Sequence, residues 1–189
     1  MGIVFLVGPR GCGKSLVSRI LEREYGCRVY NTDAMIREKT GKTVAEIVTE
    51  GGWPLFRAIE KDVLGKAVEA ASSVEDTRVV VATGGGMVLA PENRERMRAA
   101  GGVAYLSAPA DVLASRLDAP ENDPSRPPLT KLPQELEIAA VLKEREPLYR
   151  SAAHYVVDAT LDARIVARLI HEHFTKRAGR NSDTAAGTA

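Results

Sequence analysis

Residues 8–15 combine the residue types and the spacing that a polyphosphate site requires. They read GPRGCGKS and fit the pattern G-x-x-x-x-G-K-[ST]. The glycines let backbone N–H groups approach phosphate oxygens, Lys14 offers a positive charge to the outer phosphates, and the Ser15 hydroxyl can ligate a magnesium ion held by them. An apolar run, residues 3–7, precedes the octet, and a predicted helix, residues 15–24, follows it. This context favours a nucleoside triphosphate site over a Gly-rich turn that merely joins strand to helix.

A carboxylate follows the second predicted strand, residues 28–30. Ligands of open α/β sheets bind beyond the carboxyl ends of the strands, so Asp33 is expected to face the same crevice as the phosphate loop. There it could accept the proton of a substrate hydroxyl that attacks a γ-phosphate. The alternative interpretation makes Asp33 the N-cap of a helix that begins at Ala34.

Two arginines could bind a substrate anion. Arg57 and Glu60 are three residues apart on a predicted helix, which fits either a surface ion pair or an Arg57 fork that binds a carboxylate while Glu60 orients it. The sequence favours neither. Arg145, near the end of a later helix, could hold the same anion or could be a solvated helix residue among glutamates.

Three consecutive glycines, residues 84–86, follow the apolar run 79–82. Such a stretch is costly in chain entropy, so we expect its backbone to approach a ligand or another segment closely. Many P-loop proteins carry a magnesium-positioning aspartate at this place, and none follows the strand here. The pattern therefore argues against a GTPase-like switch.

Residues 118–133 contain five prolines, several charges and no sustained period. In a P-loop protein such a segment is typical of a mobile lid that excludes water from the nucleotide, and an ordinary surface loop is the alternative. Arg126 lies within it and could neutralise charge on the phosphoryl group in transfer. We expect Arg126→Ala to lower kcat far more than it weakens acceptor binding.

Apolar strands and periodic helices alternate along the whole chain, which is the pattern of a parallel sheet covered on both faces. With 189 residues and 44% hydrophobic content, one α/β domain is predicted. The polar composition after Lys176 predicts a disordered tail over residues 178–189. Strands are predicted at residues 3–7, 28–30, 79–82, 103–106 and 155–157, and further helices at 34–39, 44–50, 53–71, 91–100, 109–117, 134–150 and 161–176.

Charge and cysteine usage exclude several classes of protein. The net charge of +1 gives no support for a nucleic-acid or membrane surface, and no segment approaches 18 apolar residues. The two cysteines fit neither a disulfide framework nor a metal site, which favours a reducing cytoplasm. We expect a cytoplasmic protein, without a cleavable leader, that acts as a monomer.

Taken together in order and spacing, these motifs resemble the shikimate kinase family over residues 2–175. The resemblance rests on six groups, namely residues 8–15, 31–33, 56–60, 83–86, 126–129 and 145–149. It implies transfer of the γ-phosphate of ATP to the 3-hydroxyl of shikimate, with Mg²⁺, on the way to chorismate. It also implies a five-stranded parallel sheet of the nucleoside-monophosphate-kinase type in one domain, residues 1–177, with a substrate-binding region near 33–61 and a lid near 118–133.

Roles for individual residues follow from the resemblance. Asp33, Lys14 and Arg126 would be catalytic, and Ser15 would contact the metal. ATP would be bound by Gly11, Cys12, Gly13, Lys14, Ser15, Leu16, Arg116 and Arg126, with Arg116 stacked on adenine and residues 158–164 near it. Shikimate would be bound by Asp33, Arg57, Glu60, Gly84, Gly85, Gly86 and Arg145.

The chain departs from the family pattern at Asn31, where most members have an aspartate that helps to hold magnesium through water. The amide keeps the oxygen and loses the charge, so we expect an active enzyme with a raised magnesium requirement. Two other functions remain open: a kinase for another hydroxy acid such as gluconate, and a nucleotide-binding regulator that releases no ADP in response to shikimate.

Overall fold

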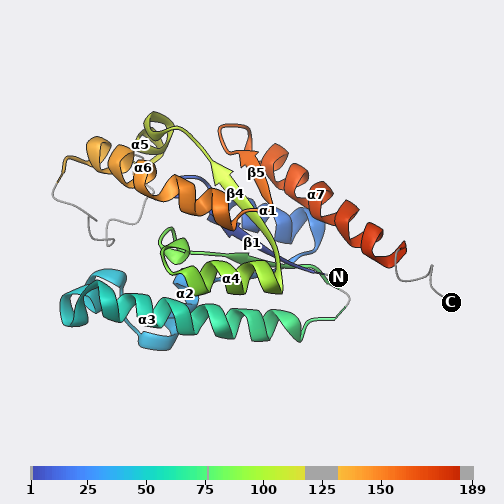
Figure 1. The fold of residues 1–189 in the computed structure, drawn as a ribbon, viewed down its shortest axis with the longest axis horizontal. Coiled ribbons are helices and arrows are strands. Elements are labelled where there is room, and N and C mark those ends of the chain that lie inside the picture. The colour runs from blue at the N-terminus through green and yellow to red at the C-terminus, as the bar shows by residue number, and fades with distance from the viewer. Residues whose placement is uncertain (1, 76, 118–131, 184–189) are drawn as a thin grey trace.

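Strands and helices alternate along the chain in the order predicted (Figure 1). The structure is a computed structural model that describes residues 2–75, 77–117 and 132–183. The elements are β1 (Ile3–Val7), α1 (Lys14–Tyr25), β2 (Arg28–Asn31), α2 (Thr32–Thr40), α3 (Val44–Ser72), β3 (Val79–Ala82), the 3-10 turn η1 (Met87–Leu89), α4 (Pro91–Ala100), β4 (Gly101–Ser107), α5 (Ala110–Leu117), α6 (Gln134–Ala152), β5 (Tyr155–Asp158) and α7 (Ala163–Asp183).

The described strands form one five-stranded parallel sheet in the order β2-β3-β1-β4-β5. This confirms the predicted fold class. The central strand β1 pairs with β3 on one side and β4 on the other, with Leu6 opposite both Ala82 and Ala104. The loops that follow β1 and β3 therefore leave the sheet side by side at its carboxyl edge.

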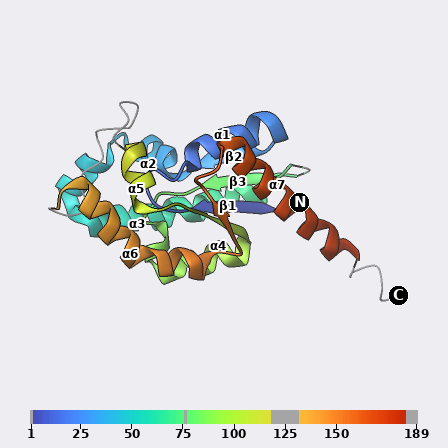
Figure 2. The same cartoon turned by 90° about the horizontal axis from the view of Figure 1, so that it is seen from above.

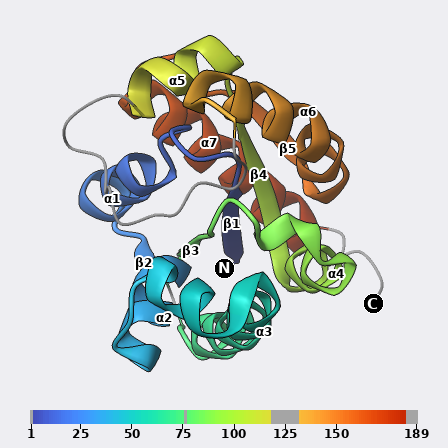
Figure 3. The ribbon, with the colours of Figure 1, turned by 90° about the vertical axis from the view of Figure 1, so that its left-hand side faces the viewer.

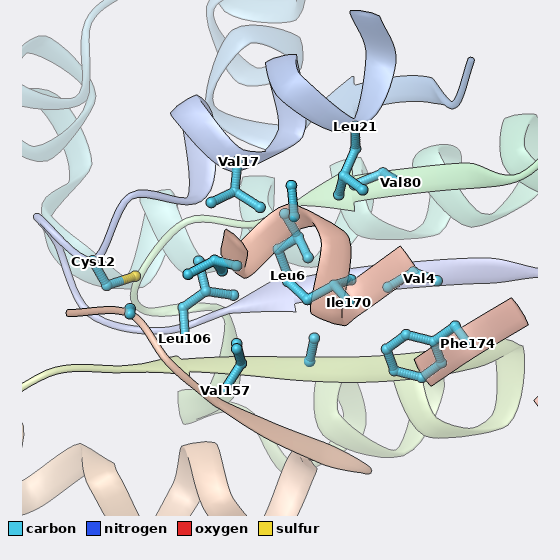
Figure 4. Close-up of a cluster of buried hydrophobic side chains, with 14 of the residues drawn as sticks. Val4, Leu6, Cys12, Val17, Leu21, Val80, Leu106, Val157, Ile170 and Phe174 are labelled. Atoms are coloured by element: carbon cyan, nitrogen blue, oxygen red, sulfur yellow. The ribbon is translucent and has the colours of Figure 1, made fainter. Parts of the chain in front are cut away.

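Both faces of the sheet are covered, which explains why β1 is apolar throughout. Val4 and Leu6 pack into a core with α1, α5 and α7 (Figure 4), while Phe5 and Val7 pack into a second core with α3, α4 and α6. Figure 2 shows α1 and α7 on one side of the sheet and α4 and α6 on the other. Each fully buried side chain of this size contributes about 1.5–3 kcal/mol to stability.

A third, smaller core joins α2 to α3 beside the sheet (Figure 3). Ile36, Ile47, Phe56 and Val63 are its buried members. Helix α3 is interrupted at Gly52, where φ is 70° and ψ is −177°, so the two helices predicted at residues 44–50 and 53–71 meet at a kink. This arrangement places the residues after the kink beside the carboxyl edge of the sheet.

The segments predicted to be flexible lie at the end of the chain and between α5 and α6. Helix α7 continues to Asp183 and so includes residues 178–183 of the tail predicted to be disordered. Residues 118–131 of the proposed lid lie outside the described residues. Among the described helices, none is both long and apolar enough to cross a bilayer.

Candidate active site

The phosphate loop connects β1 to α1 with the predicted geometry. Gly11 and Gly13 have φ values of 77° and 94°, which side chains with a Cβ rarely adopt. The Lys14 ammonium folds back over the loop and donates to the carbonyl oxygens of Gly8 at 2.7 Å and Pro9 at 2.8 Å. A positive charge thus lies beside the N-terminus of α1, an arrangement that suits a polyphosphate.

The triple-glycine loop after β3 fills the space between the phosphate loop and the α2–α3 region. A Cβ on Gly85 would lie 3.5 Å from the Gly8 oxygen, and a Cβ on Gly84 would lie 2.9 Å from both Asp33 Oδ1 and Glu60 Oε1. A Cβ on Gly86 would collide with the Arg57 guanidinium. Gly84 and Gly86 therefore lie against charged side chains that leave little room for a Cβ, and the loop brings Asp33, Glu60 and Arg57 together.

Arg57 and Glu60 form an ion pair inside the molecule. Glu60 is 1% exposed and Arg57 is 26% exposed, so the interpretation as a surface ion pair is wrong. The guanidinium also lies 5.3 Å from the ring centroids of both Trp53 and Phe56. Aromatic faces and a buried carboxylate fix the direction of the fork while part of it stays open to solvent.

Asp33 lies in the first turn of α2, but it does not cap the helix. The N-cap is Asn31, whose Oδ1 accepts hydrogen bonds from the N–H groups of Asp33 at 2.9 Å and Ala34 at 3.2 Å. The cap interpretation of Asp33 is therefore wrong. Because Asn31 satisfies these N–H groups, the Asp33 carboxylate points elsewhere, toward Gly84.

Arg145 is buried rather than solvated. It is 9% exposed, and its Nε has no hydrogen-bond partner among the described residues. Burial raises the pKa of the Glu60 carboxyl above its ordinary value; Arg57 opposes the rise, Asp33 adds to it, and Arg145 opposes it more weakly. Glu60 thus lies within electrostatic range of all three groups, and a buried guanidinium with an unused donor indicates a site for an anion.

The sequence did not reveal the groups that hold the triple-glycine loop in place. Gly84 N–H donates to Thr32 Oγ1 at 3.0 Å, Thr83 Oγ1 donates to the Leu6 oxygen at 2.9 Å, and the Tyr149 hydroxyl donates to the Gly85 oxygen at 2.6 Å. All three belong to motifs recognised in the sequence. Their hydrogen bonds depend on long-range geometry that spacing alone does not encode.

The predicted adenine-side residues are partly placed. Arg116, at the end of α5, donates from Nη2 to the Ala159 oxygen at 2.8 Å, so it is tied to the loop after β5. Asp158, the last residue of β5, accepts through Oδ1 from the N–H and hydroxyl of Thr160. Leu16 is exposed beside the phosphate loop. Arg126 lies outside the described residues.

A family model and two relatives that match this chain are described as shikimate kinases. A family model described as shikimate kinase matches residues 10–174. A shikimate kinase 2 from Dickeya chrysanthemi is 50% identical over 157 residues, which cover 83% of this chain and 87% of that protein. A shikimate kinase from Oleidesulfovibrio alaskensis is 48% identical over 164 residues, which cover 87% of this chain and 92% of that one.

The fold of this chain is similar to that of a solved shikimate kinase structure. The shikimate kinase from Acinetobacter baumannii in complex with shikimate superposes with a TM-score of 0.82 at 32% identity, covering 94% of each chain.

Proposed function

The chain belongs to the shikimate kinase family, and from this membership we infer that it transfers the γ-phosphate of ATP to the 3-hydroxyl of shikimate, giving shikimate 3-phosphate and ADP. The single observation that carries the assignment of roles is the set of charges around the triple-glycine loop. Asp33, Glu60 and Arg57 all approach that loop, and Gly85 approaches the phosphate loop. A donor and an acceptor bound there would face each other across a few ångströms, as direct transfer requires.

We assign the shikimate carboxylate to Arg57 and Arg145. The unpaired Nε of Arg145 and the partly open fork of Arg57 both offer donors to an anion, and each is anchored within the protein. Glu60 holds Arg57 through their ion pair, so that a planar carboxylate meets a guanidinium already in position. The Gly84–Gly86 backbone would supply further N–H donors to the substrate.

Asp33 acts as the general base in this assignment. As the 3-hydroxyl oxygen forms its bond to the γ-phosphorus, its proton passes to the Asp33 carboxylate and the bond from phosphorus to the leaving ADP oxygen breaks. Lys14 neutralises charge on the phosphates, which grows on the leaving oxygen during transfer. Gly11, Cys12, Gly13 and Leu16 would line the nucleotide side together with Arg116.

Mg²⁺ fits the donors that the phosphate loop provides. No three acidic, histidine or cysteine side chains cluster as a metal site within the described ranges, so phosphate oxygens and the exposed Ser15 hydroxyl would hold it. When bound, the ion neutralises negative charge on the phosphates. The free, buried thiols of Cys12 and Cys27 suit a reducing compartment, which supports a cytoplasmic enzyme. We propose that it acts as a monomer.

A coupled ADP-release assay with ATP and magnesium tests the function. Shikimate should give turnover, and gluconate and quinate, offered at the same concentrations, should give little. ADP release that prefers gluconate would identify a different small-molecule kinase, and ATP binding without shikimate-dependent ADP release would identify a nucleotide-binding regulator.

A further inference from the structure

The Tyr149 hydroxyl makes a short contact with the backbone of the triple-glycine loop. It donates to the Gly85 carbonyl oxygen at 2.6 Å, and the Tyr149 side chain is 1% exposed. Its ring stacks on Tyr105 of β4, with centroids 5.1 Å apart and planes inclined by 19°. The phenol is therefore held by its neighbours and has little freedom to leave the carbonyl.

The backbone of a glycine-rich loop needs contacts of this kind from other segments to fix its conformation. Residues 84–86 have no side chains to restrict rotation of their peptide planes. The Gly84 N–H is fixed by Thr32 on one side, and the Gly85 carbonyl by Tyr149 on the other. Because the carbonyl and the N–H of a trans peptide point in opposite directions, the Tyr149 bond also fixes the direction of the Gly86 N–H.

Tyr149 comes from the helix that carries Arg145. The two residues are one turn apart on α6, so the same face of the helix presents the guanidinium and the phenol. Burial raises the pKa of the Tyr149 hydroxyl, and the nearby Arg145 charge opposes the rise only in part. The hydroxyl therefore keeps its proton at neutral pH and remains a donor.

We propose that Tyr149 is a positioning residue for the acceptor: its hydroxyl fixes the Gly85–Gly86 peptide and keeps the loop in register with Arg57 and Arg145. The proposal rests on the function inferred above and adds a residue that touches neither substrate. A carbonyl that lost this bond would be free to rotate, and Gly86, which lies against the Arg57 guanidinium, would move with it. Acceptor binding would weaken, while the phosphate loop would keep its own hydrogen bonds.

A purely structural role is the alternative, in which the hydroxyl only satisfies a buried carbonyl. The two roles differ in what they affect. A structural role predicts lower stability with unchanged kinetics in the protein that remains folded, whereas a positioning role predicts a selective rise of KM for shikimate.

Tyr149→Phe provides the test, with Tyr105→Phe as the matched control. Both changes delete one buried phenolic hydroxyl from the same stacked pair, and the Tyr105 hydroxyl has no hydrogen-bond partner among the described residues. We expect Tyr149→Phe to raise KM for shikimate about tenfold while KM for ATP stays within about twofold, the size of effect that follows from losing one buried hydrogen bond. Tyr105→Phe should leave both KM values unchanged.

Direct binding gives a readout that does not depend on turnover. Trp53 is the only tryptophan of the chain and lies 5.3 Å from the Arg57 guanidinium, so its fluorescence should report acceptor binding. Titration of each variant with shikimate alone should show about tenfold weaker binding for Tyr149→Phe and none of this loss for Tyr105→Phe.

The outcomes separate this proposal from the function on which it rests. Wild-type protein without shikimate-dependent ADP release would overturn the function itself. An active wild type together with a Tyr149→Phe variant of unchanged KM for shikimate would overturn only the role of Tyr149. A Tyr149→Phe variant that does not fold would also contradict the proposal, which assigns the hydroxyl to the loop rather than to global stability.

Discussion

One added carbon atom in the triple-glycine loop would displace a neighbouring charged side chain. A Cβ added at Gly86 would take the place of the Arg57 guanidinium and push it away from Glu60. We expect Gly86→Ala to raise KM for shikimate by at least about tenfold, because a charge-assisted fork is lost, and to change KM for ATP little. Steady-state kinetics with each substrate varied in turn would measure the split.

Gly65→Ala is the matched control for this change. Its new Cβ would also meet the end of an arginine side chain, with Arg96 Nη1 at 3.0 Å, but in the later part of α3. Equal increases of KM for shikimate in the two variants would show that general strain, and not the position of Arg57, causes the effect.

Glu60 makes stability depend on pH. Its folded pKa is raised above the ordinary value of 4.5, so the unfolded chain releases this proton first as the pH rises. Below the unfolded pKa, both the folded and the unfolded state hold the proton. Between the unfolded and the folded pKa the free energy of unfolding falls with rising pH, and above the folded pKa this loss is complete. In Glu60→Gln this decrease should be absent. Urea unfolding of both proteins at a series of pH values from 4.5 upward would reveal it, and parallel stability curves would contradict it.

Asn31 caps α2 with its only oxygen. An aspartate at this position could cap with one oxygen and offer a second, charged oxygen to a metal-bound water, whereas the amide offers an NH₂ group. We expect Asn31→Asp to lower the magnesium concentration for half-maximal activity by about tenfold. A magnesium titration of both proteins at fixed ATP measures this, and superimposable titration curves would exclude a role for the missing charge.

At the residue scale, chemistry was predictable from the sequence where a residue type is rare in its context. The octet with Lys14, the arginines and the glycine triplet all stood out for this reason. Tyr149 and Thr32 did not, because a tyrosine or threonine in an apolar setting is ordinary until the backbone path shows which carbonyl or N–H it meets. The sequence could not predict that Glu60 and Arg145 are buried, since both lie in polar stretches of helix.

The last helix depends on a glycine in the strand beneath it. A Cβ on Gly102 of β4 would overlap the Phe174 ring of α7, which is part of the core on that face. We expect Gly102→Ala to destabilise the protein by about 1–3 kcal/mol, because the ring must leave its position. Urea unfolding would measure the loss, with Gly2→Ala as a control whose Cβ meets nothing within 4 Å.

A second substitution tests whether overlap with the Phe174 ring causes the destabilisation by Gly102→Ala. If overlap with the ring is responsible, Phe174→Leu combined with Gly102→Ala should be less destabilised than the sum of the two single changes. Additive effects would mean that Gly102 matters for a reason unrelated to Phe174.

Element boundaries were predictable where turn chemistry is strong. Strands β1 and β3 have the predicted bounds because a parallel strand buried on both sides must be apolar at every position. Helix α2 begins two residues before the predicted start because Asn31, not Asp33, provides the cap. The end of α7 could not be predicted, since polar residues at a helix end fit a coil or a helix equally well.

At the scale of the molecule, stability is unevenly distributed between the sheet and the α2–α3 region. The sheet has a large core on each face, while α2 and the start of α3 share only a small one. We expect amides of α2 and early α3 to exchange through local opening well before those of β1, β3 and β4, and shikimate to slow that exchange selectively. Hydrogen exchange followed by mass spectrometry would show this, and equal protection of both regions would refute it.

The pairing of β1 with β3 affects when the acceptor site can form during synthesis of the chain. Thr83 bonds to Leu6 across 77 residues of chain, and that contact sets the loop on which the acceptor site is built. During synthesis, a nascent chain can close the phosphate loop early, but no acceptor site exists until β3 has emerged and docked. Catalytic competence is therefore a late product of folding, because a polypeptide truncated before residue 83 lacks both the triple-glycine loop and Arg145.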